Sequence, residues 1–260
     1  MNRHLLKYTL LCLSVILIII GCAAPFRLNK PLPEIGQQHL IHQIQSHASQ
    51  LETFQGRARL SVISQDGSFQ GTVKILAKTP DSLWMKIEGP LGVDLAMGRF
   101  DREQLLLYVP MENTVYIGFM DEIGKTSPLS FDVHVPDMLL GVLGLLIPPN
   151  NAEGSLLSVS SDNKNYILQS ADGEQIWIEP KGPVVSRWEQ RNGEDEVLWS
   201  WEGEDFKNNK GLRLPQIIRL TTYYPRQRIT LFYESVETNR SMESNWAEIV
   251  LPESVQYVRL

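Results

Sequence analysis

The alternation of apolar and polar side chains around residues 83–97 restricts this chain more than any other feature. Apolar side chains take every second position, first at Leu83, Met85 and Ile87 and then at Val93, Leu95 and Met97. A period of two is that of a β-strand with one buried face. Between the two runs lies Gly89-Pro90-Leu91-Gly92, whose glycines and proline are typical of a tight turn. The stretch therefore predicts two antiparallel strands joined by a turn.

One residue of that turn is unusual for its position. Leu91 is a large apolar side chain between Pro90 and Gly92, where it can hardly fold back onto the sheet. Two interpretations remain open. Leu91 packs against a neighbouring loop, or it projects from the protein toward an apolar partner.

The same alternation recurs through most of the chain. It predicts strands over 56–62, 69–77, 83–88, 93–97, 104–109, 113–119, 155–161, 165–170, 175–180, 184–191, 196–201, 216–222, 228–234 and 254–258. The first six follow one another with tight turns such as Asp66-Gly67, so we expect an antiparallel meander. Pro252 precedes the last strand, which suits the edge of a sheet. The fold class is therefore mainly β with a few helices (α+β).

Two segments have helical patterns instead. Residues 34–54 place Leu40, Ile41, Ile44, Ala48 and Leu51 on one helical face, and polar side chains fill the rest. These include His39, His42 and His47, but their spacing favours a solvated face over a metal site. Residues 136–147 are apolar all round and are bounded by Pro136 and Pro148-Pro149. Such a helix is either a buried plug or a lid over an apolar ligand. The residues expected to form the lid are Met138, Leu139, Leu140, Leu143 and Leu146.

The first 33 residues predict export and lipid attachment. Arg3 and Lys7 precede an apolar run, which is typical of a signal peptide over 1–21. Ile19-Ile20-Gly21-Cys22 resembles the bacterial lipobox, so Cys22 is the expected lipidation site, and 22–33 reads as a proline-containing tether. The alternative is an ordinary cleaved signal with Cys22 incidental. Because no Asp follows Cys22, the residue that retains enterobacterial lipoproteins at the inner membrane, we expect the outer membrane, with the protein facing the periplasm.

Charge and motif content argue against several classes of function. The net charge is −6 and becomes two units more negative without residues 1–21, which disfavours nucleic-acid binding. No nucleophile elbow, phosphate loop or Cys-x-x-Cys occurs, so we expect no enzyme, cofactor or metal. The acidic turns 194–196 and 202–205 read as solvated. A hydrolase that uses a carboxylate pair assembled by folding is the remaining enzymatic alternative.

The order of these features resembles the LolB family of outer-membrane lipoproteins. The resemblance covers residues 34–260 and rests on five features: the lipobox, the first helix, Gly56-Arg57-Ala58, Pro90-Leu91-Gly92 and the leucine-rich segment before Pro148. It implies an incomplete antiparallel β-barrel closed by the N-terminal helix and by the 136–147 segment. In that family, Pro-Leu-Gly lies in a protruding loop that helps insert lipoproteins into the membrane. The apolar hollow would be lined by Leu60, Val62, Val73, Ile75, Met85, Ile87, Leu95 and Met97.

The resemblance also implies a function and partners. The chain would be a monomer that accepts acylated lipoproteins from a periplasmic LolA-like carrier and helps insert them into the outer membrane. The alternative is a LolB-like lipoprotein that binds another lipid or serves as a non-enzymatic envelope scaffold. Binding a lipoprotein or another lipid needs an apolar interior, which the alternating strands are able to supply.

Overall fold

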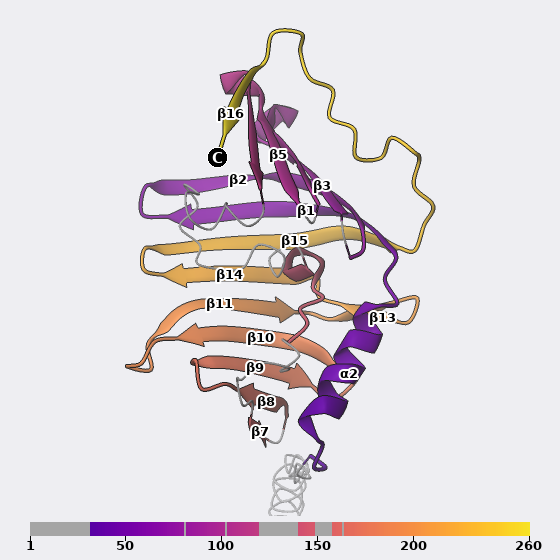
Figure 1. The fold of residues 1–260 in the computed structure, drawn as a ribbon, viewed down its shortest axis with the longest axis vertical. Helices are drawn as coiled ribbons and strands as arrows, with labels where there is room; N and C mark the ends of the chain where they lie inside the picture. The colour runs from indigo at the N-terminus through magenta and orange to yellow at the C-terminus, as the bar shows by residue number, and fades with distance from the viewer. Residues whose placement is uncertain (1–31, 81, 102, 120–139, 149–157, 163) are drawn as a thin grey trace, which may run out of the picture. The chain divides into compact units, whose positions relative to one another are not determined.

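A single large sheet dominates the structure, which is a computed structural model that describes residues 32–80, 82–101, 103–119, 140–148, 158–162 and 164–260. Its fourteen described strands are hydrogen-bonded in the order β16-β6-β5-β4-β3-β2-β1-β15-β14-β11-β10-β9-β8-β7 (Figure 1). The two ends of this order are different strands that do not pair, so the described sheet is open. The expectation of a mainly β chain with few helices is confirmed.

The strands agree closely with the alternating segments. The first run is β1 (Thr53–Ser64), β2 (Gly67–Lys78), β3 (Ser82–Glu88), β4 (Asp94–Phe100), β5 (Gln104–Val109) and β6 (Thr114–Phe119). The second is β7 (Ser158–Ser161), β8 (Tyr166–Gln169), β9 (Glu174–Glu179), β10 (Val184–Arg191), β11 (Val197–Glu204), β14 (Ile217–Tyr223) and β15 (Arg226–Thr238). All these neighbours pair antiparallel, and β1 pairs with β15 to join the two runs.

The end of the chain completes the sheet. β16 (Gln256–Arg259) lies at the edge, as expected, and pairs parallel with β6. A separate two-stranded ladder consists of β12 (Lys207–Asn209) and β13 (Leu212–Leu214). In Figure 1 this ladder lies near α2 (Gln37–Ala48), the first helix of the described chain.

One face of the sheet carries the main apolar core, and we call it the core face. Cross-strand pairing places Ala58 opposite Val73, and Val73 opposite Ile87. Ala58 and Val73 are buried together with the predicted apolar face of α2, namely Leu40, Ile41, Ile44, Ala48 and Leu51. The helix therefore stabilises the sheet by removing apolar surface of both elements from water.

Two helix predictions need correction. The 136–147 segment is helical only as far as Leu143, because Gly144 takes a left-handed φ of 75° and residues 145–148 are not helical. Leu145 N–H donates to the carbonyl of Leu140, which is a common way for a helix to end at a glycine. The first helix ends at Ala48 rather than running to residue 54. Among the described residues, no helix combines the length and apolar composition that crossing a membrane requires.

His47 is also not on a solvated face, as the sequence had suggested. It is buried, and its Nε2 lies 3.3 Å from both the backbone N and O of Arg213 in β13. Burial lowers the pKa of His47, and the nearby Arg213 charge lowers it further, against the opposing effect of the Arg213 backbone hydrogen bond. His47 therefore joins α2 to the β12–β13 ladder in its neutral form.

This burial predicts a loss of stability in acid. Because the pKa of His47 is lower in the folded chain, the unfolded chain binds the proton first as the pH falls below about 6.5. The free energy of unfolding should therefore decrease in that range, and His47→Gln should weaken the decrease. Urea unfolding at several pH values measures this. His42→Gln, at an exposed position of the same helix, is the control; equal pH dependence in both variants would contradict the prediction.

Candidate functional site

The turn between β3 and β4 presents Leu91 fully to solvent. The residues Pro90–Gly92 form a single 3₁₀ turn, η1, and the Leu91 side chain is 104% exposed. Gly89 N–H donates to the carbonyl of Val93 at 2.8 Å, and Gly92 N–H donates to the carbonyl of Gly89 at 3.2 Å. The turn is thus closed by its own backbone. Leu91 does not pack against a neighbouring loop, which was one of the two interpretations.

The backbone of Leu91 is in an uncommon conformation. Its φ is 63° and its ψ is 15°, the left-handed region that favours glycine. For a bulky side chain this conformation costs about 1–2 kcal/mol. Packing does not explain a bulky residue in this conformation, because Leu91 is fully exposed.

Charged side chains brace the base of this turn. Lys86 Nζ lies 2.7 Å from Asp94 Oδ1 and 3.2 Å from Glu88 Oε1, and Lys74 Nζ lies 3.7 Å from the same Glu88 oxygen. The hydrogen bond to Asp94 is the main reason that the pKa of Lys86 is raised. These contacts connect β2, β3 and β4 directly below η1. Ion pairs between three neighbouring strands therefore lie at the base of the turn that carries Leu91.

Six of the eight side chains predicted to line a hollow lie on the core face. Leu60, Val73 and Ile75 are buried within the core, whereas Val62, Met85 and Ile87 are half-buried against it. The three half-buried residues are the more accessible ones for a ligand. Their role as lining remains a prediction.

Of the other two predicted lining residues, Met97 is not on this face, and the strand pairing does not assign Leu95 to either face. Met97 pairs with Lys86, while Met85 pairs with Gly98, so Met97 shares the face of Lys86. A β-bulge shifts the register between Ile87 and Glu88 and leaves Leu95 as the extra residue. Because the side-chain period is two, this one-residue shift moves Met97 to the opposite face.

The register also reveals a row of apolar side chains that the sequence analysis missed. Phe69 pairs with Val62, Val62 with Ile229, and Ile229 with Leu220 on the core face. All four are half-buried against the core, and we call them the apolar row. Strands lie about 4.8 Å apart, so the row is roughly 15 Å long. Only the pairing of β1 with β15, which is distant in sequence, brings these residues together.

The segment 140–147 packs on the core face and is held there by two hydrogen bonds. Trp201 Nε1 donates to the carbonyl of Gly141 at 3.1 Å, and Tyr233 Oη donates to the carbonyl of Val142 at 2.6 Å. Carbonyls at a helix C-terminus lack helical partners, so these aromatic donors satisfy them. Burial raises the pKa of Tyr233, which stays a neutral donor. Leu143 and Leu146 are buried and Leu140 is half-buried, whereas Met138 and Leu139 lie outside the described residues.

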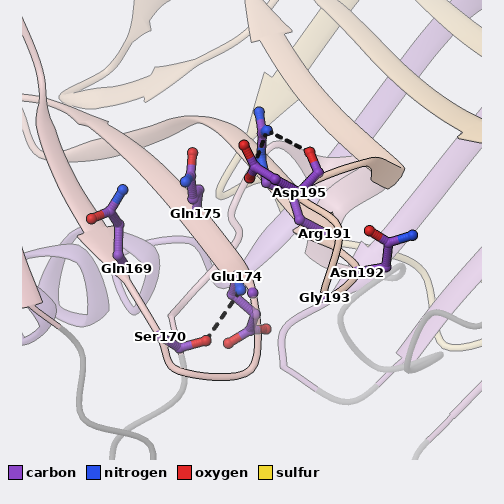
Figure 2. Close-up of a pocket in the computed structure, with 9 residues that line it drawn as sticks. Gln169, Ser170, Glu174, Gln175, Arg191, Asn192, Gly193 and Asp195 are labelled. Carbon is purple, nitrogen blue, oxygen red and sulfur yellow. Dashed lines mark hydrogen bonds and ion pairs between the residues drawn. The ribbon is translucent and has the colours of Figure 1, made fainter.

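A small cavity borders segment 140–147, and a larger one lies elsewhere on the sheet. One of about 10 Å³ separates Leu140 and Leu143 from the β2–β3 turn, which leaves room for about one water. The other, of about 340 Å³, lies between the β8–β9 and β10–β11 turns (Figure 2). It is lined by polar groups, and Arg191 is paired there with Asp195 and with the buried Glu189. Neither of these two cavities has the size and apolar lining that an alkyl chain requires.

Several predicted features receive no structural description. Cys22 and the tether 22–33 lie outside the described residues except for Leu32 and Pro33. Within the described part of the chain, no three His, Cys, Asp or Glu side chains are grouped to hold a metal ion. Asp195, in one of the acidic turns, is engaged with Arg191.

Comparison with solved structures identifies the fold. A LolA-superfamily protein from Nitrosomonas europaea matches 83% of this chain and 99% of its own, with a TM-score of 0.56 and 12% identity. A putative outer membrane lipoprotein-sorting protein domain from Vibrio parahaemolyticus has a TM-score of 0.54 at 11% identity, over 81% of this chain and 96% of its own. A DUF1329 family protein from Desulfovibrio piger has a TM-score of 0.58 at 12% identity, over 81% of this chain and 96% of its own.

These likenesses show that the chain has a LolA-like fold. No family model matches the sequence. No curated protein matches it either. The specific likeness to LolB therefore rests on the sequence features alone.

The hydrogen bonds to Gly141 and Val142 predict how firmly segment 140–147 is held. Tyr233→Phe removes the donor and leaves a carbonyl unsatisfied, at a cost of about 1–3 kcal/mol. The amide of Leu145, which is bonded within this segment, should then exchange with solvent faster, as measured by hydrogen–deuterium exchange. Tyr116→Phe, which removes an exposed hydroxyl from Glu112, is the control. Unchanged exchange in Tyr233→Phe would show that the bond does not hold the segment.

Proposed function

We propose that this chain is a membrane-anchored, non-enzymatic protein that accepts acylated lipoproteins and helps insert them into the outer membrane. The lipidated Cys22 anchors the monomer facing the periplasm, and a LolA-like carrier supplies the lipoprotein. The acyl chains bind on the core face, and Leu91 contacts the bilayer. The single observation that supports this most strongly is Leu91, fully exposed in a strained backbone at the tip of a braced turn.

Energetics favour this division of roles. Each CH₂ of an acyl chain gains about 0.8 kcal/mol on leaving water, so a lipoprotein's chains need a shield between membranes. Leu91 gains only roughly 1.5–3 kcal/mol on burial in a bilayer, too little to anchor a protein. It is enough to orient a protein that is already tethered and to disturb the lipid locally.

The core face has the chemistry that an acyl chain requires. Met85 and Ile87 are half-buried apolar positions on the same face as the apolar row, to which Val62 belongs. Methionine adapts its shape easily, which suits a ligand that must be released.

Three substitutions of Leu91 test the proposal. Leu91→Glu should reduce lipoprotein release into liposomes about tenfold or more, because it removes roughly 1.5–3 kcal/mol of membrane burial and adds a charge. Leu91→Ala should reduce release less. Leu91→Gly should also reduce release, while raising the free energy of unfolding by about 1 kcal/mol through relief of strain.

The glycine variant separates function from folding. A residue kept for stability would give a weaker fold when replaced, whereas we expect a stronger fold with poorer delivery. Urea unfolding and a fluorescent assay of release measure the two quantities on the same preparations. Undiminished release by all three variants would exclude Leu91 from delivery.

A further inference from the structure

A second exposed apolar side chain lies at the tip of the neighbouring hairpin. Met111 is the middle residue of η2 (Pro110–Glu112), the 3₁₀ turn between β5 and β6, and is 78% exposed. Nothing in the proposed function uses it. Val93, next to the Leu91 turn, is also exposed, at 53%.

The two turns lie at the same end of the sheet. In an antiparallel meander, the β3–β4 and β5–β6 connections share one end, because β4 and β5 run between them. Met97 pairs with Tyr108, and continuing this register brings Asp94 level with Met111. Leu91 is three residues from Asp94, so the two tips lie on the order of 10 Å apart. Figure 1 shows both short turns together at the upper end of the β3–β6 region.

The Met111 turn is held as firmly as the Leu91 turn. Asn113 N–H donates to the carbonyl of Pro110 at 3.1 Å, and Tyr116 Oη donates to Glu112 Oε2 at 2.6 Å. The C-terminal segment adds two more bonds: Asn113 Nδ2 donates to the carbonyl of Ser254 at 2.8 Å, and Gln256 N–H to that of Asn113 at 3.0 Å. The edge strand β16 thus fixes this tip through Asn113. A preformed tip loses little entropy when it binds.

We propose that Met111 is a second membrane-contact residue, so that the chain touches the bilayer at two points, Leu91 and Met111. This rests on the proposed function, since it extends the contact that Leu91 begins. Two contacts prevent the sheet from rocking along the line that joins them, whereas one contact leaves rotation about the tip free in every direction. The hydrogen bond from Gln256 in β16 to Asn113 helps to hold the turn that carries Met111.

The surroundings of the two tips favour lipid over a protein partner. A stable protein interface buries about 800 Å² on each side, far more than two separate side chains offer. Glu88, Asp94 and Glu112 lie at the bases of the turns and leave no excess of positive charge to attract anionic groups. The contact is therefore apolar and should not depend on anionic lipid.

Site-specific fluorescence tests the second contact. Met111→Cys, Leu91→Cys and Leu198→Cys are made in the full lipidated chain, labelled with an environment-sensitive dye and placed in phosphatidylcholine vesicles. Leu198 is a 38% exposed side chain on β11 and serves as the control. The parent chain, treated identically, reports labelling of Cys22. We expect a blue shift and quenching by nitroxide-labelled lipid at positions 91 and 111, at least about twofold stronger than at 198.

Each outcome decides one claim. A label that enters lipid at 91 but stays in water at 111 would overturn the two-point contact and leave the proposed function intact. Labels that stay in water at both positions would overturn both. The signals should persist in about 1 M salt, where the Debye length is near 3 Å; their loss would show an electrostatic contact instead.

Discussion

The apolar core face of the sheet is the constraint on which the rest of the structure depends. A sheet with one apolar face is stable in water only when another element covers that face. Here α2 covers part of it, and segment 140–147 packs on it through hydrogen bonds from Trp201 and Tyr233. Segment 140–147 also buries Leu143, Leu145 and Leu146 in the core, so the same surface that holds the fold together is the one proposed to take up acyl chains.

Much of the fold follows from local sequence pattern. The alternating strands, the turn at Asp66-Gly67, the apolar face of α2 and the edge position of β16 are all confirmed. The exposure of Leu91 agrees with one of the two interpretations that the sequence left open. Each of these depends on residues that are close in the chain, where periodicity and turn chemistry determine the structure.

The features that the sequence could not predict depend on pairing between distant strands or on a one-residue shift in strand register. The bulge beside Glu88 changes the face of Met97, and no pattern within β4 marks that shift. The apolar row needs the pairing of β1 with β15, and the burial of His47 needs β13. Gly144 did carry a signal for the helix end, because glycine is the usual residue just past a helix. The role of Leu91 at a membrane remains a prediction.

Photo-crosslinking from the two faces of the β3–β4 hairpin tests most directly whether the core face holds the acyl chain. A photoreactive amino acid is placed at Ile87, on the core face, or at Met97, on the opposite face of the neighbouring strand. The captured molecule is then identified by mass spectrometry. The account predicts capture of an acylated peptide from position 87 and little from position 97. Equal capture from both positions, or none from 87 when lipoprotein is bound, would contradict it.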